Sequence, residues 1–473
     1  MYNQSPELNL WIKNTLILIY MFRPIRSKRI SHVIDEITDQ YMFAGDLHRP
    51  WIIGFSGGKD STILLTLVWI ALRRIREDVS TPFQLKRPVY VVCNDTMVEN
   101  PIITAYVDDV LTKIETAARD QDLPFFVKKT TPKLDESFWL NVIGKGYPVP
   151  NNTFRWCTDK LKIKPTSAFL HEQIDEKGEA IVLLGTRYEE SKTRERSMKK
   201  YEQKGSRLSK HTTDANTYVY APIKDLMLEE VWYVINAVES PWDFDNNILY
   251  QIYADASADD YECPTVVTDK EHKSCGQSRF GCWTCTVVKE DKSMKGLINK
   301  GQEWMAPLFK FRNDLVEGRN VSENRSGKRR GGMIAITEEG HNQGSYAPHY
   351  MAKLLRELLE IQKEVQKTHP EVTLITNQEL IAIQVTWNRD GNFDWHVGEI
   401  YRKVYDKDIS TNNIKSLGQT ERRILKEVCE EKPEFYHLID NLIDLQESKT
   451  LLLSKYGLHN DVERQIERFV KEN

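Results

Sequence analysis

The fold is decided by residues 51–62, which read Trp51-Ile52-Ile53-Gly54-Phe55-Ser56-Gly57-Gly58-Lys59-Asp60-Ser61-Thr62. Residues 51–55 form a short apolar run typical of a buried strand, and residues 61–73 combine apolar side chains with strong helix formers. Glycines between a strand and a helix let backbone N–H groups point inward, and the start of a helix attracts anions. This stretch therefore predicts a phosphate-binding loop.

Three further apolar runs have the character of buried strands, and helical patterns separate them. Strands are predicted over residues 88–93, 124–129 and 180–185, and helices over residues 104–119 and 228–238. This alternation predicts an α/β fold, with a parallel twisted sheet flanked by helices. Ligands in such sheets bind at the carboxyl ends of the strands, so the segments that follow each strand are the candidate site segments.

The loop after the first strand is expected to bind the phosphates of ATP. Lys59 adds a positive charge, and Asp60 either caps the following helix or faces a magnesium ion. A Gly-rich turn without a ligand is the alternative for the whole loop. The candidate nucleotide ligands in the loop are Ser56, Gly57, Gly58, Lys59, Asp60, Ser61 and Thr62.

Two other strand ends carry polar residues in the same region of the sheet. Asp95 follows the second strand and would meet magnesium or the nucleotide, or else cap a turn. Gly185 follows the fourth strand and lets the backbone approach a ligand. Arg187 and Arg194 come next and can each bind a phosphate in a forked manner, unless they belong to a surface helix of ion pairs.

Residues 155–165 place cations beside a thiol and a tryptophan. Arg155 and Lys160 are candidate site residues, and cations near Cys157 would lower the pKa of its thiol and make it a nucleophile. A buried structural cysteine is the alternative.

Four of the seven cysteines fall between residues 263 and 285. Cys263, Cys275, Cys282 and Cys285 have the spacing C-x11-C-x6-C-x2-C, and four thiolates suit either tetrahedral zinc or an iron–sulfur cluster. Structural zinc usually uses two close pairs, and here only the last two cysteines are close, which favours a [4Fe-4S] cluster.

Composition limits the partners. Acidic residues outnumber basic ones, 69 against 65, so nucleic-acid binding would need a local patch rather than a global field. Two basic stretches, residues 192–212 and 319–332, are predicted as loops that could supply one, or that are simply solvated. No apolar segment approaches the length of a membrane span, so we expect no membrane contact and a cytoplasmic location.

The loop Ser-Gly-Gly-Lys-Asp-Ser at residues 56–61 resembles the PP-loop of the ATP pyrophosphatase superfamily. The segments 155–165 and 185–194 resemble two elements of its phosphoadenylyl-sulfate (PAPS) reductase-like branch. With the downstream cysteines, this order of motifs resembles the DndC and SspD families of DNA phosphorothioation proteins. The resemblance covers roughly residues 30–340.

The resemblance implies an ATP-dependent sulfurtransferase. ATP and Mg²⁺ would be bound at the PP-loop, a DNA phosphate would be adenylated with release of pyrophosphate, and sulfur would replace a non-bridging oxygen. A cysteine desulfurase and other subunits of the phosphorothioation complex are the implied partners, with the basic loops on DNA. Lys59, Asp60, Arg155, Cys157, Lys160 and Arg187 would carry the chemistry.

The expected organisation has four parts: an N-terminal helical segment (1–50), the PP-loop domain (51–250), a cluster and basic-loop region (251–340) and a helical C-terminal domain (341–473). Three other functions remain open. They are a PAPS or adenylyl-sulfate reductase, a tRNA thiolase, and a non-enzymatic DNA-binding subunit with a relic nucleotide site.

Overall fold

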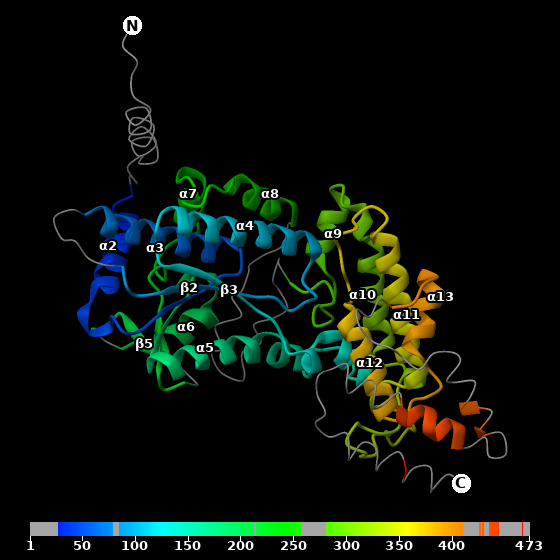
Figure 1. Ribbon diagram of the computed structural model, residues 1–473. Helices are drawn as coiled ribbons and strands as arrows, with labels where there is room; N and C mark the ends of the chain where they lie inside the picture. The colour runs from blue at the N-terminus through cyan, green and yellow to red at the C-terminus, as the bar shows by residue number, and fades with distance from the viewer. Residues whose placement is uncertain are drawn as a thin grey trace.

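The computed structural model describes residues 27–78, 85–203, 205–211, 214–256, 281–409, 425–426, 428–429, 435–443 and 466. Parts of the predicted N-terminal and C-terminal helical regions thus lie outside the described residues. An α/β body and a helical body lie side by side (Figure 1). Within the described residues, no helix is both long enough and apolar enough to cross a membrane.

The α/β body is built on one six-stranded sheet with the order β3-β2-β1-β4-β6-β5. All neighbouring strands are parallel except β5 and β6, which are antiparallel. This confirms the predicted parallel sheet and adds two strands that were not predicted. The strands are β1 (Trp51–Gly54), β2 (Val89–Asn94), β3 (Phe125–Thr130), β4 (Ala180–Leu183), β5 (Leu208–Lys210) and β6 (Thr217–Tyr220).

Helices cover both faces of the sheet, because alternate strand residues point to opposite sides. Ile53 packs into the core shared with the upper helices of Figure 1, whereas Ile52 packs into a smaller core with Phe169 of α5. The helices of the first face are α2 (Lys28–Met42), α3 (Lys59–Glu77), α4 (Pro101–Asp120), α7 (Leu228–Ala237) and α8 (Asn246–Ala256). Those of the second are α5 (Lys164–Lys177) and α6 (Lys192–Tyr201).

Helix α3 begins directly in the predicted phosphate loop. Its residues from Lys59 to Leu72 are all buried, so it is a central helix rather than an amphipathic surface one. The helix predicted from residue 61 is confirmed, and it starts two residues earlier, at Lys59. Residues 59–62 therefore form its first turn, where the backbone N–H groups have no partner inside the helix.

The helical body has a core of its own, formed by α9 to α13 and the long connection between β3 and β4. That connection contains two π-helical turns, Leu140–Gly144 and Thr158–Ile163. Helices predicted from residue 346 onward are confirmed by α11. The helices are α9 (Lys292–Asn299), α10 (Ala306–Gly318), α11 (Pro348–Val365), α12 (Asn377–Arg389) and α13 (Val397–Tyr405). Short turns of 3₁₀ helix occur at Ala44–Asp46, Leu134–Glu136, Tyr188–Glu190, Glu303–Met305 and Ser322–Asn324.

The prediction of a loop over residues 192–212 is wrong for most of its length. The segment contains α6 and β5, with residues 204 and 212 outside the described part. The side chain of Ser191 accepts a hydrogen bond from the backbone N–H of Arg194, which caps α6, and Lys199 pairs with Glu195 one turn away. These local contacts stabilise a helix despite its polar composition.

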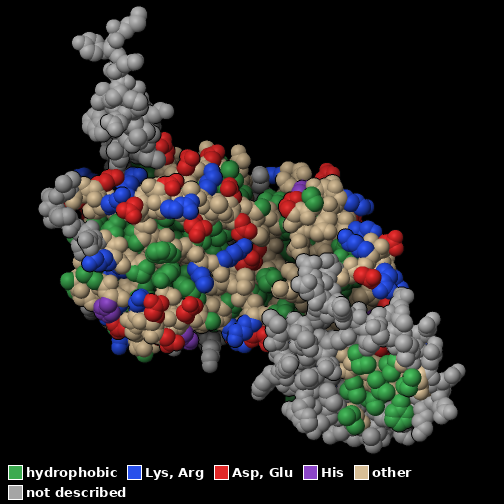
Figure 2. Space-filling model, viewed as in Figure 1, with side chains coloured by type: hydrophobic (Ala, Val, Ile, Leu, Met, Phe, Trp, Pro, Cys, Tyr) green, Lys and Arg blue, Asp and Glu red, His purple; other side chains and the backbone are tan. Residues whose placement is uncertain are grey.

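Charges on the surface are mixed. On the face drawn in Figure 2, basic and acidic side chains are interspersed over the described part of the molecule. Any attraction of a polyanion therefore depends on a local cluster of cations, as the composition predicts.

Candidate nucleotide site

The phosphate loop lies at the point where the direction of the sheet topology changes. Strands β2 and β3 follow on one side of β1, whereas β4 lies on its other side. The carboxyl ends of strands on either side of such a point border a crevice that binds ligands in open α/β sheets. The loop after β1 and the segment after β4 therefore meet here, as the two motifs predict.

Gly57 adopts a left-handed backbone conformation with φ of 74°. A Cβ atom at this position would lie 2.7 Å from Cγ2 of Val107 on α4, so only glycine fits. Tyr106 of α4 donates a hydrogen bond from its hydroxyl to the carbonyl of Gly57 at 3.0 Å. Helix α4 thus supports the loop from behind, a contact that the sequence analysis did not include.

The hydroxyls of the loop are directed toward one another. The Oγ atoms of Ser56 and Ser61 lie 3.1 Å apart, and Ser61 donates to the carbonyl of Gly58 at 3.0 Å. These contacts order the turn that places the first N–H groups of α3 at the strand end.

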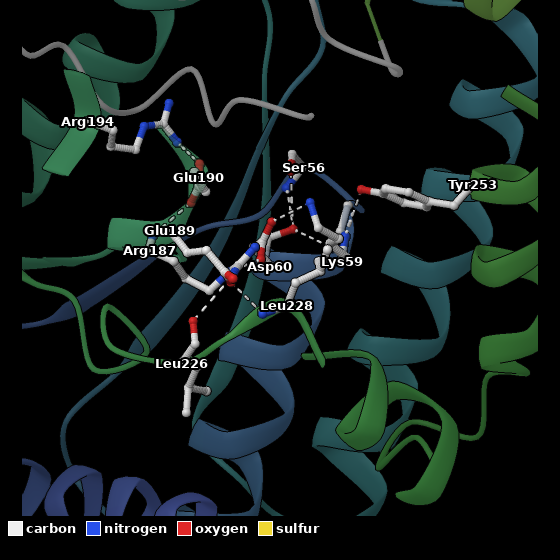
Figure 3. Close-up of polar contacts among 12 residues, drawn as sticks. Ser56, Lys59, Asp60, Arg187, Glu189, Glu190, Arg194, Leu226, Leu228 and Tyr253 are labelled. Atoms are coloured by element: carbon white, nitrogen blue, oxygen red, sulfur yellow. Dashed lines mark hydrogen bonds and ion pairs between the residues drawn. The ribbon is translucent and has the colours of Figure 1, made fainter. Parts of the chain in front are cut away.

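A buried ionic network lies behind the loop (Figure 3). One carboxylate oxygen of Asp60 accepts from Nε of Arg187 at 2.7 Å, and the other lies 3.0 Å from Nζ of Lys59. All three side chains are at most 10% exposed. Asp60 does not cap α3, whose N-cap residue is Gly58 without a side-chain cap. The capping interpretation of Asp60 is therefore wrong.

Arg187 is a structural partner of the loop in this arrangement rather than an open phosphate fork. Its Nη1 also donates to the carbonyl of Leu226 at 3.2 Å and to Glu189 at 3.0 Å, and its side chain is only 2% exposed. Burial lowers the pKa of the guanidinium, but the charge and hydrogen bond of Asp60, together with the charges of Glu190 and Glu189, raise the pKa overall. Nε and Nη1 thus have acceptors within the protein, and the catalytic and phosphate-binding role of Arg187 stays a prediction.

Gly185 allows two backbones to approach each other. A Cβ atom there would lie 2.7 Å from the carbonyl oxygen of Asp60. The missing side chain lets the β4 segment lie against the start of α3, and the approach of a ligand to this backbone stays a prediction.

Arg194 and Glu190 form an ion pair whose side chains are at most 10% exposed. Burial raises the pKa of Glu190 to about 7, although Arg194 counteracts the shift. Glu190 also accepts from the backbone N–H of Arg187 at 2.7 Å. Arg194 therefore forms an ion pair, as in the alternative prediction of a surface helix of ion pairs, but this pair is largely buried.

Tyr253 of α8 reaches the start of α3 from the other side of the loop (Figure 3). Its hydroxyl accepts a hydrogen bond from the backbone N–H of Lys59 at 3.1 Å, and Nζ of Lys59 lies 5.6 Å from the centre of its ring. This N–H belongs to the group that an anion would use. Sequence reasoning missed Tyr253, because nothing local marks a tyrosine 194 positions away as a partner.

Asp95 forms the turn that was one of its two predicted roles. Its Oδ1 accepts from the backbone N–H of Met97 at 2.7 Å, and its Oδ2 lies 3.2 Å from Nζ of Lys129. Asn94 donates to the carbonyl of Leu161 at 3.1 Å, which ties the segment 155–165 to the end of β2.

The segment 155–165 is anchored on the helical body. Arg155 donates to Asn152 at 3.1 Å, and Cys157 is half-buried against the core of that body. Nζ of Lys160 lies 5.3 Å from the centre of the Tyr147 ring. The structure thus brings this segment to the same sheet edge as the phosphate loop, while the nucleophilic role of Cys157 stays a prediction.

Cys282 and Cys285 lie in one tight turn beside the end of β2. The Cys282 thiol is 3.3 Å from Oγ1 of Thr96 and 3.9 Å from Glu99, and Trp283 donates its backbone N–H to Val98 at 3.0 Å. Burial, followed by the charge of Glu99, raises the pKa of Cys282 well above its usual value.

Two of the four predicted cluster ligands are therefore neighbours, as shared ligation of one metal centre requires. Cys263 and Cys275 lie outside the described residues. Among the residues that are described, no group of three or more His, Cys, Asp or Glu side chains could hold a metal ion. The [4Fe-4S] cluster remains a prediction, and the positions of Cys282 and Cys285 are compatible with it.

The second basic stretch uses most of its arginines internally. Arg319 donates to the carbonyls of Pro150 and Thr286, and Arg325 to those of Gly344, Arg319 and Gln343. Arg330 pairs with Asp390 at 2.7 Å. The predicted open loop of solvated cations is therefore reduced to Lys328 and Arg329.

Comparison with known proteins gives one family match, and it spans the sheet and the phosphate loop. The family model for the phosphoadenosine phosphosulfate reductase domain matches residues 50–288. An uncharacterised protein of Methanocaldococcus jannaschii, MJ0066, is 25% identical over 210 residues, which cover 43% of this chain and 34% of that protein. The chain thus spans about a third of the length of this curated relative. A crystal structure of PAPS reductase from Candida auris in complex with phosphate matches 53% of this chain and 93% of its own, with 13% identity and a TM-score of 0.28.

Proposed function

The chain belongs to the phosphoadenosine phosphosulfate reductase domain family, and from this premise we propose that it is an ATP pyrophosphatase that prepares a DNA phosphate for sulfur transfer. In the proposed reaction, an oxygen of the DNA phosphate attacks the α-phosphorus of ATP and pyrophosphate leaves. Sulfur then replaces the activated oxygen, which departs with AMP.

The observation that carries the ATP part is the loop after β1. Its Gly57 has the left-handed conformation that turns backbone N–H groups inward, and α3 begins at once with its N-terminus toward the strand end. Backbone N–H groups at a helix N-terminus bind phosphate well. The residues present thus fit the phosphates of a nucleotide.

The charges around the loop support the same proposal. Lys59 and Asp60 are held within a buried network, so both side chains are oriented before a ligand arrives. When bound, Mg²⁺ would neutralise charge on the phosphates, and the carboxylates near the loop, Asp60 and Asp95, are its candidate oxygen ligands.

The sulfur part rests on the position of the cysteines and on the sequence resemblance. Cys282 and Cys285 lie beside the segment that leaves β2, next to the edge where the loop lies. With Cys263 and Cys275 they would hold a [4Fe-4S] cluster close to the activated phosphate. A cysteine desulfurase would supply the sulfur as a persulfide, a two-electron donor would reduce it to the level of sulfide, and other phosphorothioation subunits would present the DNA.

Product analysis tests the ATP part directly. The protein is purified without oxygen, incubated with ATP and Mg²⁺ in the presence of duplex DNA, and the products are separated. We expect AMP and pyrophosphate, and a Lys59→Met variant should release neither. Formation of ADP and orthophosphate would contradict the proposal.

A second candidate function is the reduction of phosphoadenylyl sulfate, which the family match itself favours. That reaction consumes a thiol and releases sulfite without cleaving ATP. Incubating the reduced protein with phosphoadenylyl sulfate and a dithiol distinguishes the two. Sulfite release without pyrophosphate release from ATP would favour the reductase.

A further inference from the structure

A hairpin excursion leaves the helical body between α10 and α11. It is closed at its base by hydrogen bonds from Ser326 N to Ser345 O at 2.7 Å and from Gly344 N to Ser326 O at 2.9 Å. Its outer turn is closed by a bond from Arg329 N to Met333 O at 2.8 Å. We name residues 326–345 the basic hairpin. The basic hairpin is coloured yellow-green in Figure 1 and lies near the end of α12.

The outer part of the basic hairpin carries large apolar side chains that are open to solvent. Met333 is 63% exposed, Ile334 is 76% exposed and Ile336 is 50% exposed. Single exposed apolar residues are common, but three within four positions on one projecting turn form a patch of the kind that marks an interaction site.

Cations flank this apolar tip. Lys328 and Arg329 are exposed, and in the described part of the chain no hydrogen bond or ion pair of their side chains is seen. At the base, Arg325 donates to the carbonyls of Gly344, Arg319 and Gln343 and lies over the ring of Tyr346. Arg325 thus anchors the base of the hairpin, while Lys328 and Arg329 remain available in its outer turn.

The basic hairpin and the residue that follows it contact the connection between β3 and β4, which also contains the segment 155–165. Arg330 donates to the carbonyl of Lys145 at 3.1 Å, and Tyr346 donates its backbone N–H to Gly146 at 2.7 Å. Burial and the nearby charges of Lys160, Arg330 and Arg389 lower the pKa of Lys145 to about 8, against the opposing effect of Asp135. A row of cations therefore runs from the 155–165 segment toward the hairpin.

Carboxylates also lie along this row, because Asp135 acts on Lys145. Asp390 is paired with Arg330 at 2.7 Å. Glu338 and Glu339 lie on the second turn of the excursion, which is closed by a bond from Gly340 N to Thr337 O at 2.9 Å. The outer turn from Lys328 to Met333 contains cations and glycines without a carboxylate.

We propose that the basic hairpin binds duplex DNA, with Lys328 and Arg329 on phosphates and Met333 and Ile334 inserted as a wedge between base steps. This inference rests on the proposed function and identifies the surface that would hold the DNA. Apolar wedges flanked by cations kink a duplex and partly unstack it, which exposes the backbone near the wedge. A membrane surface is the competing partner, but three apolar side chains on a turn offer little area to insert, and the cations lead to the segment 155–165 at the end of β2.

The test uses the full-length protein and a fluorescent duplex that carries 2-aminopurine, whose emission rises when bases unstack. One variant is Lys328→Ala/Arg329→Ala, and the other is Met333→Ser/Ile334→Ser. Matched controls are Lys177→Ala, an exposed cation on α5, and Phe43→Ser, an apolar side chain that is 59% exposed after α2. Melting temperature and ATP binding in the absence of DNA are measured for each variant, and both should match the wild type.

For the cation variant we expect weaker binding and a salt dependence whose slope falls by about 2, one for each phosphate that is no longer neutralised. The apolar variant should bind about 5- to 10-fold more weakly, because the apolar side chains that would insert between base steps are replaced by polar ones. It should keep its salt slope and show no rise in emission. The controls should bind as the wild type does.

The outcomes separate this inference from the proposed function. If the wild type binds the duplex and both hairpin variants bind it equally well, the hairpin assignment is overturned while the DNA substrate stands. If the wild type does not bind duplex DNA, the DNA part of the proposed function fails as well. Binding to anionic vesicles that only the hairpin variants lose, without any change on DNA, would replace DNA by a membrane.

Discussion

Replacing Arg187 by methionine tests whether this residue acts mainly as the structural partner of Asp60. The change removes the 2.7 Å bond from Nε to Asp60 and leaves the carbonyl of Leu226 without that donor. Asp60 retains Lys59 at 3.0 Å, so the carboxylate is only partly neutralised. Breaking a buried pair by removing one partner costs about 3–5 kcal/mol. We expect a loss of unfolding free energy in that range.

The assay is urea unfolding of the full-length protein, with Arg76→Met as the matched control. Arg76 also pairs with an aspartate, Asp122 at 3.4 Å, but both side chains are exposed, at 43% and 87%. Exposed pairs contribute about 0.2–1 kcal/mol, so the control should barely move the urea midpoint. The double variant Asp60→Asn/Arg187→Met should lose about 1–3 kcal/mol less than the two single variants summed, because the two residues are in contact.

Nucleotide binding provides the opposing expectation. If Arg187 were an open phosphate ligand, Arg187→Met would weaken ATP binding and leave the urea midpoint close to that of Arg76→Met. That result, together with additive losses in the double variant, would refute the role assigned to the buried network.

Three other changes test the site. Gly57→Ala forces an alanine into a left-handed conformation with its Cβ against Val107. We expect the free energy of unfolding in urea to fall by at least about 1–2 kcal/mol and ATP binding to weaken. Wild-type behaviour in both assays would contradict the loop geometry. Tyr253→Phe removes the hydroxyl that accepts a hydrogen bond from the backbone N–H of Lys59. Pyrophosphate should then bind up to about 5-fold more tightly in calorimetry. Weaker binding would mean that the hydroxyl is a ligand of pyrophosphate and not its competitor for this N–H. Burial raises the pKa of Glu190 from 4.5 to about 7, so ionising this carboxyl opposes folding. Its contribution to stability is fully present below pH 4.5 and is lost as the pH rises to 7. Relative to Glu190→Gln, the wild type should lose up to about 3 kcal/mol of unfolding free energy between pH 4.5 and pH 8, and parallel pH profiles of the two proteins would argue against the shift.

Local pattern was enough to predict the first half of the α/β body. The apolar runs at 51–55, 88–93, 124–129 and 180–185 have the length and composition of buried strands, and each matches a strand of the sheet to within two residues. The phosphate loop was equally predictable, because the turn after β1 requires a residue without a side chain at Gly57. The short edge pair β5 and β6 and the helix α6 were missed, since polar residues in a capped helix look like a loop when they are taken one by one.

The partners of the site residues could not be predicted in the same way. Arg187 meets Asp60 from 127 positions away, and Tyr253 meets Lys59 from 194 positions away. Sequence motifs mark residues that are charged and near a strand end, but a guanidinium can equally face a phosphate or a buried carboxylate. Which of these it does depends on the distance between elements.

The sequence by itself determined the alternation of strands and helices, the phosphate loop and the cysteine spacing, because each of these follows from residues within a few positions of one another. The tertiary structure decided that Asp60 is neutralised by Lys59 and Arg187, that Cys282 lies beside Glu99 at the end of β2, and that Lys328 and Arg329 stay exposed while their neighbouring arginines are bound. The physical reason is that charges and hydrogen-bond donors are satisfied by whichever acceptor the packing brings near, and packing is a property of the whole chain.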